Sequence, residues 1–194
     1  MTTWSLAFPA VPAERAERYR AAGLWSSSTI TGIVREAAAG VPGKLAVVDQ
    51  SRALDYAGLW RRCSAVAGRL RREGIAAGQT VVLCLPNSVT WLECFLGLVQ
   101  CGALPVMATE SLRARELIRI IEASHADHVV TAVADGRSAA LHRAVHDAIG
   151  LLPADAPAPV VHEVRVSDGL TADATDADSG EALHQVLPGD PALV

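Results

Sequence analysis

At 194 residues and 20.3 kDa, the chain is long enough for one domain, or for one domain and part of another. Its 51% hydrophobic residues and mean hydropathy of +0.26 exclude a disordered tail or a polar linker protein. A net charge of -4 and the absence of a basic stripe argue against a nucleic-acid partner.

Hydrophobic periodicity predicts an alternation of helices and strands along most of the chain. Helix-spaced apolar stripes, bounded by capping residues or glycines, cover residues 13–22, 30–39, 56–73, 89–101, 114–121 and 141–148. Short apolar runs predict strands at 45–48, 53–54, 80–85, 104–107, 128–133 and 160–166. Because strand and helix alternate from residue 45 to residue 149, we expect an α/β fold with a mostly parallel sheet.

The stretch from residue 80 to residue 109 carries a single charge, Glu93. Its strand should be buried on both faces, and its helix, apolar almost all round, should be sandwiched inside the fold. Pro86 and Gly102 interrupt the stretch, so it is too short to span a membrane. The first residues also lack a basic, apolar signal sequence. We therefore expect a cytoplasmic protein with no membrane partner.

The chain divides by composition into three parts: a helical lead-in at 1–44, an α/β subdomain at 45–150, and a loop, strand and acidic connector at 151–194. In the connector, Asp173, Asp176 and Asp178 suggest calcium binding. However, the glycine and the closing glutamate are not where an EF-hand loop needs them, so a solvated connector is the better interpretation.

Cysteine and histidine spacings do not predict a metal site. The four cysteines lie in apolar patterns without a C-x-x-C pair, which is typical of reduced core thiols: Cys63, Cys84, Cys94 and Cys101. His142 and His146 are four residues apart on a predicted helix, a spacing that can bind a metal ion, but the sequence shows no third ligand.

Catalytic motifs are absent from the 194 residues. There is no phosphate-binding P-loop, dinucleotide fingerprint, nucleophile elbow or zinc-protease motif. The turn at 85–88 lacks the glycines that let backbone N–H groups approach a phosphate. The arginines of helix 56–73 lie mostly off its apolar stripe and should face solvent: Arg61, Arg62, Arg69, Arg71 and Arg72.

Several segments resemble the N-terminal part of acyl-adenylate-forming ligases. The strongest are Val81–Asn87, the apolar helix after it, and Gly102–Val106; Leu54–Leu59 resembles the segment that these enzymes place just before. The start of the chain, with Phe8-Pro9 and Glu17–Trp25, is similar to the aryl-acid AMP ligases that activate dihydroxybenzoate or salicylate in siderophore assembly.

This resemblance implies an incomplete N-terminal subdomain of an adenylate-forming enzyme. The complete enzyme would use ATP and Mg²⁺ to form an acyl-AMP and pass the acyl group to a carrier thiol, such as that of an aryl carrier protein. The phosphate loop and catalytic lysine of the family lie further along the chain; Lys44, the only lysine here, stands in an early turn and does not match. We therefore expect no catalytic, cofactor-binding or metal-binding residue, no cofactor bound by this chain alone, and a partner that supplies the remainder of the ligase.

One stretch departs from the aryl-acid pattern. Where that branch shows a Leu-Pro-Ser-His-Arg-like sequence, this chain has Thr109–Arg113, with Glu110 and Leu112 in place of the proline and histidine. The turn and strand start at 188–194 resemble the segment just before the family's phosphate loop, which favours truncation. Two alternatives stay open: one half of a split ligase, or a non-catalytic α/β interaction module.

Overall fold

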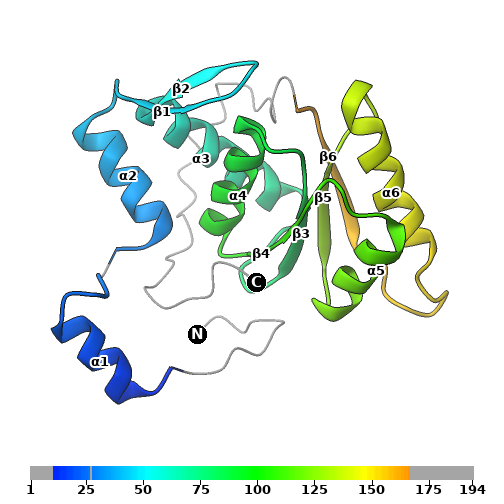
Figure 1. Cartoon of the computed structure of the whole chain (residues 1–194), viewed down its shortest axis with the longest axis horizontal. Coiled ribbons are helices and arrows are strands. Elements are labelled where there is room, and N and C mark those ends of the chain that lie inside the picture. Colours follow the sequence, from blue (N-terminus) through cyan, green and yellow to red (C-terminus); the bar gives the residue numbers. More distant parts are fainter. Residues whose placement is uncertain (1–10, 27, 167–194) are drawn as a thin grey trace.

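The computed structural model describes residues 11–26 and 28–166 of the chain. Its helices are α1 (Ala13–Ala21), α2 (Ile30–Gly40), α3 (Tyr56–Arg72), α4 (Val89–Cys101), α5 (Ala114–Ala123) and α6 (Ala139–Gly150). Its strands are β1 (Leu45–Val48), β2 (Ala53–Asp55), β3 (Thr80–Cys84), β4 (Leu104–Ala108), β5 (His128–Ala132) and β6 (Val160–Val164). The elements predicted for the described ranges are confirmed, with ends that differ by a few residues (Figure 1). The aspartates considered for calcium, the acidic connector and the turn at 188–191 lie outside the described residues.

Capping side chains set the starts of three helices. Thr29 and Asp55 accept hydrogen bonds from N–H groups in the first turns of α2 and α3, at 3.0 and 2.7 Å. Ser88 caps α4 in the same way at 3.1 Å. At the other end of α4, Gly102 has a φ of +75°, the left-handed conformation that glycine adopts without strain.

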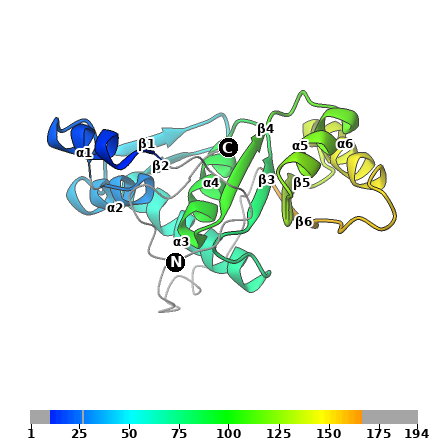
Figure 2. The same ribbon diagram turned by 90° about the horizontal axis from the view of Figure 1, so that it is seen from below.

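Strands β3 to β6 form a parallel sheet in the order β4-β3-β5-β6, and β1 and β2 form a separate antiparallel hairpin. Figure 2 shows α3 and α4 on one side of the sheet and α5 and α6 on the other. Alternate residues of β3 follow these two layers: Val81 and Leu83 belong to the cluster with α3 and α4, whereas Val82 and Cys84 belong to the cluster with α5 and α6. The predicted α/β class and mostly parallel sheet are confirmed.

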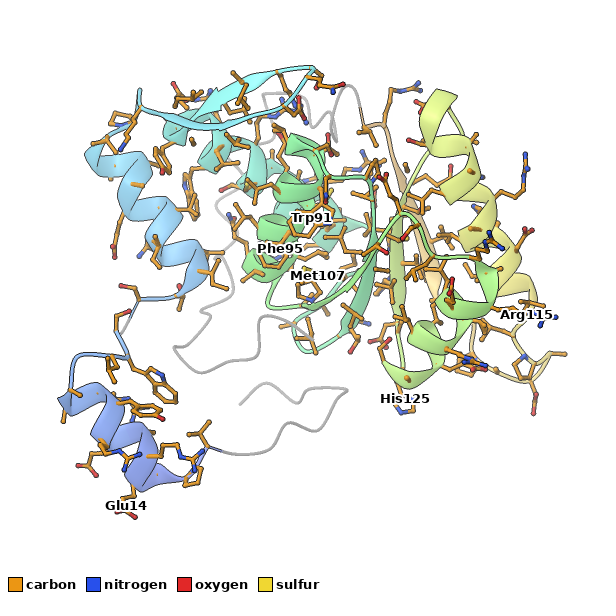
Figure 3. The ribbon with its side chains drawn as sticks, viewed as in Figure 1. Glu14, Trp91, Phe95, Met107, Arg115 and His125 are labelled. Carbon is orange, nitrogen blue, oxygen red and sulfur yellow. The ribbon has the colours of Figure 1, made fainter. Side chains whose placement is uncertain are left out.

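Helix α4 is buried almost all round, as its sequence predicts, because it lies between α3 and the sheet. Helices α3 and α4 pack closely at Gly97, which has no side chain. A Cβ atom there would lie 2.6 Å from Cγ1 of Val66. On another side of α4, Trp91 and Phe95 stack with ring centroids 5.4 Å apart (Figure 3). Gly97 therefore allows α3 and α4 to pack at this close spacing.

One sequence expectation about this layer is wrong. Arg62 of α3 does not simply face solvent but pairs with Glu93, the single charge of α4, whose side chain is fully buried. Arg52, from the hairpin, donates to the other carboxylate oxygen of Glu93 at 3.0 Å and to Thr90 Oγ1 at 2.6 Å. Two guanidinium groups thus compensate one buried carboxylate, which fastens the hairpin and α3 to α4.

The four cysteines are free and buried, as predicted. Burial raises the pKa of the Cys84 thiol to about 12 and that of Cys101 to about 11, and it raises those of Cys63 and Cys94 further. These thiols are therefore packing groups in the folded chain and not nucleophiles. Among the described residues, no helix is both long and apolar enough to cross a bilayer.

Candidate functional site

The sheet order creates a crevice at the carboxyl ends of β3 and β5. From β3 the chain leaves through α4 toward β4, whereas from β5 it leaves through α6 toward β6 on the other side. The two connections diverge to opposite faces of the sheet, which is the arrangement that leaves a ligand-sized opening in parallel α/β folds. The sheet topology therefore indicates the loops after β3 and β5 as the candidate site.

A pocket of about 690 Å³ lies at this position. The β3–α4 turn, the loop after β5, the start of α6 and the hairpin turn line it: Asp49, Gln50, Ser51, Pro86, Asn87, Ser88, Glu110, Asp135, Ser138, Ala140, Leu141 and Val166. These described lining residues include three carboxylates, Asp49, Glu110 and Asp135. They include no lysine, arginine or histidine. The wall is therefore acidic.

Asp49 occupies the position where an anion would bind. Its Oδ2 accepts the N–H group of Val89, the first residue of α4, at 2.7 Å, and its Oδ1 accepts the backbone N–H groups of Ser51 and Arg52 and the hydroxyl of Ser51. The hydrogen bond from Val89, followed by those from Ser51, holds the pKa of Asp49 far below its ordinary value. The hairpin thus satisfies the positive end of α4 with the protein's own carboxylate.

This arrangement suits neither a nucleotide phosphate nor Mg²⁺. A phosphate at the start of α4 would have to displace Asp49 and would meet an acidic wall without a cation among the described residues. Mg²⁺ needs convergent oxygen ligands, but Asp49, Glu110 and Asp135 do not form a close cluster of ligand atoms. The described residues therefore do not fit the ATP and Mg²⁺ that the sequence resemblance implies for a complete enzyme.

A second polar cluster, which sequence reasoning missed, lies at the amino-terminal end of the sheet. His128 Nδ1 is 3.0 Å from His162 Nε2, and His162 Nδ1 is 2.9 Å from a carboxylate oxygen of Glu73. Gln79 Oε1 is 3.1 Å from His128 Nε2. Arg69 donates to the second oxygen of Glu73 at 2.6 Å. The chain of contacts joins α3, β5 and β6, and both histidines are buried.

Within this cluster, protonation of the buried His128 is disfavoured. Burial, and then the neighbouring His162, lowers the pKa of His128, which the nearby Asp127 only partly opposes. Partial burial raises the pKa of the Glu73 carboxyl, but the hydrogen bonds from Arg69 and His162 outweigh it and leave the pKa below its ordinary value. The cluster is thus stable as a carboxylate with a neutral His128.

Acidification should therefore weaken the fold. His128 has a lower pKa in the folded chain than its ordinary 6.5, so stability falls as the pH drops below 6.5 through the folded-state pKa. Each unit of depression corresponds to about 1.4 kcal/mol. Urea unfolding at several pH values should show this loss, and His128→Gln should flatten it. The control His125→Asn, at an exposed turn where φ is +47°, should keep the wild-type slope; equal slopes in all three proteins would refute the assignment.

Comparison with known proteins places the chain in a family. The model of the AMP-binding enzyme family matches residues 34–194. The chain belongs to the AMP-binding enzyme family. The predicted resemblance to acyl-adenylate-forming ligases is therefore confirmed, and the curated relatives of this chain include salicylate-activating enzymes, in line with the predicted similarity to the aryl-acid branch.

Two relatives illustrate the branch. The salicyl-AMP ligase / salicyl-S-ArCP synthetase of Mycobacterium tuberculosis is 38% identical over 135 residues, which cover 66% of this chain and 24% of that protein. The pyochelin synthase PchD of Pseudomonas aeruginosa is 38% identical over 109 residues, or 56% of this chain and 20% of PchD. The chain thus spans about a fifth to a quarter of the length of these relatives.

Solved structures agree with the fold. The apo structure of Mycobacterium smegmatis MbtA has a TM-score of 0.69 and 30% identity, and the match covers 96% of this chain and 34% of MbtA. The N-terminal subdomain of Klebsiella oxytoca NpsA has a TM-score of 0.64 at 19% identity, over 88% of this chain and 38% of that subdomain. The second likeness concerns the fold alone. The predicted fold, an incomplete N-terminal subdomain of an adenylate-forming enzyme, is confirmed.

The stretch that departs from the aryl-acid pattern, Thr109–Arg113, follows β4. Leu112, which replaces the histidine, packs against the apolar cluster beneath α5 and α6. Glu110, which replaces the proline, lines the acidic crevice. Ser111 and Arg113 match the pattern, and the backbone N–H of Arg113 donates to Glu116 at 2.8 Å where α5 begins. The departure therefore adds one apolar contact to the core and one negative charge to the crevice.

Proposed function

We propose that these 194 residues are the N-terminal part of an ATP-dependent acid-AMP ligase that activates an aryl acid for siderophore or related nonribosomal assembly. The observation that carries the proposal is the 38% identity over 135 residues to a salicyl-AMP ligase / salicyl-S-ArCP synthetase. The sites for ATP, Mg²⁺ and the acid belong to the remainder of such an enzyme, and the described residues supply the scaffold on which that remainder folds.

A carrier protein is the proposed acceptor of the activated acid. The salicyl-AMP ligase relative carries a carrier-protein acylation activity in its own name, salicyl-S-ArCP synthetase. A solved neighbour of the same fold is an artificially fused adenylation-PCP di-domain from Klebsiella oxytoca. The acyl group would pass from AMP to the carrier thiol at a site formed by the remainder of the ligase, so the carrier is a partner of the complete enzyme.

The isolated chain is expected to be inactive. Acyl-adenylate formation needs donors that stabilise the charge developing on the phosphates, and loss of one such donor typically costs about 10²–10³ in rate. The acidic crevice offers no such cation among its described lining residues. Purified residues 1–194 should therefore give no acid-dependent ATP–pyrophosphate exchange with salicylate or 2,3-dihydroxybenzoate, under conditions where a complete aryl-acid AMP ligase does. Exchange above background would refute the scaffold role.

A further inference from the structure

Two histidines and a glutamate meet between α6 and β6, at the edge of the described sheet. His142 and His146 are one helical turn apart on α6, with ring centroids 4.3 Å apart. Oε1 of Glu163, on β6, is 2.8 Å from His142 Nε2 and 3.0 Å from His146 Nε2. The three ligand atoms all lie within 4.8 Å of one another. They are half-exposed, with exposed side-chain fractions of 23%, 44% and 40%.

Buried residues next to these three side chains in the sequence fix their orientation. On α6, Leu141 and Val145 are buried in the core, which turns the adjacent histidines toward the edge strand. On β6, Val164 faces the opposite layer with α3 and α4, so Glu163 faces α6. β6 is hydrogen-bonded to β5 in register, with Glu163 opposite Thr131. Helix α6 and strand β6 lie side by side (Figure 1), and these two elements present the three side chains to one point.

We propose that His142, His146 and Glu163 bind one divalent transition-metal ion, with zinc as the expected occupant. Two imidazole nitrogens and one carboxylate oxygen are a ligand set of open zinc sites, in which water takes the fourth position. Imidazole ligands favour zinc, copper or nickel over magnesium and calcium. The site lies outside the crevice and is independent of adenylate chemistry.

An ion would require the ligand atoms to move: the two Nε2 atoms, which lie within 4.8 Å of each other, must come to about 3.3 Å. Tetrahedral zinc with bonds of about 2.0–2.1 Å separates its ligand atoms by about 3.3 Å, so the two nitrogen–oxygen distances must each open by a few tenths of an ångström. Half-exposed side chains can rotate by this amount without moving the backbone. A neutral ring that donates Nε2–H to Glu163 would change tautomer on binding: its single proton would move to Nδ1, and the freed Nε2 lone pair would bind the ion.

Without an ion, the cluster is held together by hydrogen bonds. Oε1 of Glu163 is the shared partner of both rings, so one carboxylate oxygen already faces the two Nε2 atoms. The ion would then tie α6 to β6, an edge strand of the described sheet. Binding should therefore stabilise the folded chain: at a free zinc concentration of about 100 Kd, the unfolding equilibrium constant should fall about 100-fold.

Cobalt(II) and zinc titrations of the chain, purified without a histidine tag, test the proposal. We expect one equivalent of Co²⁺ with the visible spectrum of a nitrogen–oxygen site, its displacement by Zn²⁺, and a zinc-dependent rise in Tm. His142→Ala and the isosteric Glu163→Gln should each weaken binding by more than the roughly 10–100-fold that loss of an outer-sphere partner costs. Circular dichroism would establish that both variants are folded.

The matched control is His125→Ala. His125 is exposed at the turn that leads into β5, at the opposite end of the sheet strands from Glu163 (Figure 3). This variant should bind Co²⁺ and Zn²⁺ like the wild-type chain. The proposal is overturned if neither ion binds up to about 1 mM, where affinity is too weak to be specific. It is equally overturned if binding persists in His142→Ala and Glu163→Gln.

Discussion

Replacing Glu93 with alanine should destabilise the chain by about 3–5 kcal/mol, the usual cost of removing one partner from a buried ion cluster. The Glu93 side chain is fully buried, and its two carboxylate oxygens accept from Arg52 and Arg62. Without it, two guanidinium groups would remain beside an apolar core without their shared counter-charge. The hairpin would also lose one of its polar contacts with α4.

Urea unfolding of Glu93→Ala, Arg52→Ala and the double variant measures this effect. The double-variant cycle should show a coupling of about 0.5–3 kcal/mol, because the two side chains touch directly. Glu122→Ala makes the same substitution at an exposed position of α5 and should change stability by no more than about 0.5 kcal/mol. Equal effects of Glu93→Ala and Glu122→Ala would contradict the structural role of the cluster.

A second large effect is expected where α3 and α4 touch. In Gly97→Ala, the new Cβ would lie 2.6 Å from Val66 Cγ1 and 3.3 Å from the backbone nitrogen of Ala67. Val66 is buried and β-branched, so it cannot rotate away freely. Overpacking of this kind costs about 1–3 kcal/mol, even though alanine is intrinsically better than glycine in a helix.

Gly68→Ala supplies the matched comparison within α3. A Cβ at Gly68 would meet only the end of the Arg72 side chain, at 3.6 Å. This variant should therefore gain up to about 1 kcal/mol from helix propensity. Thermal or urea unfolding should move the two variants in opposite directions. A stabilised Gly97→Ala would show that the helices are less closely packed than the structure describes.

The fold was largely predictable because its signals are local. Strand 80–84 is a continuous apolar run bounded by Pro86, and α4 is an apolar helix bounded by Ser88 and Gly102, so propensity, pattern and capping agree. The parallel arrangement follows from the alternation of strands with helices, because parallel strands need a crossover. The ends of several helices and strands differ from the predicted ends by one or two residues.

The polar clusters could not be predicted because their members are far apart in sequence. Glu93 is 31 and 41 residues from its two arginines, and His162 is 89 residues from Glu73. The one local signal was a single glutamate in an otherwise apolar helix, which implies a buried charge with a partner. The third ligand of the proposed metal site was invisible for the same reason, because only the fold brings β6 beside α6.

The candidate site shows the same limit. The turn after β3 lacks glycines, and from this we predicted that the turn does not bind phosphate. For the complete protein this stays a prediction. No local pattern indicates that Asp49 reaches from the hairpin to the start of α4, because that contact spans 40 residues. It is this carboxylate, more than the missing glycines, that makes the crevice unsuitable for an anion.

The most direct test of the scaffold account is a segment exchange. Residues 1–194 would replace the matching segment of the Mycobacterium tuberculosis salicyl-AMP ligase, and salicylate-dependent ATP–pyrophosphate exchange would be measured. If the catalytic groups all come from the recipient, the folded chimera should retain exchange within about 100-fold of the parent, the cost of a 1 Å misplacement by a remote segment. Glu110→Pro and Leu112→His should restore part of any loss. A folded chimera that shows no exchange, with or without these two substitutions, would contradict the account.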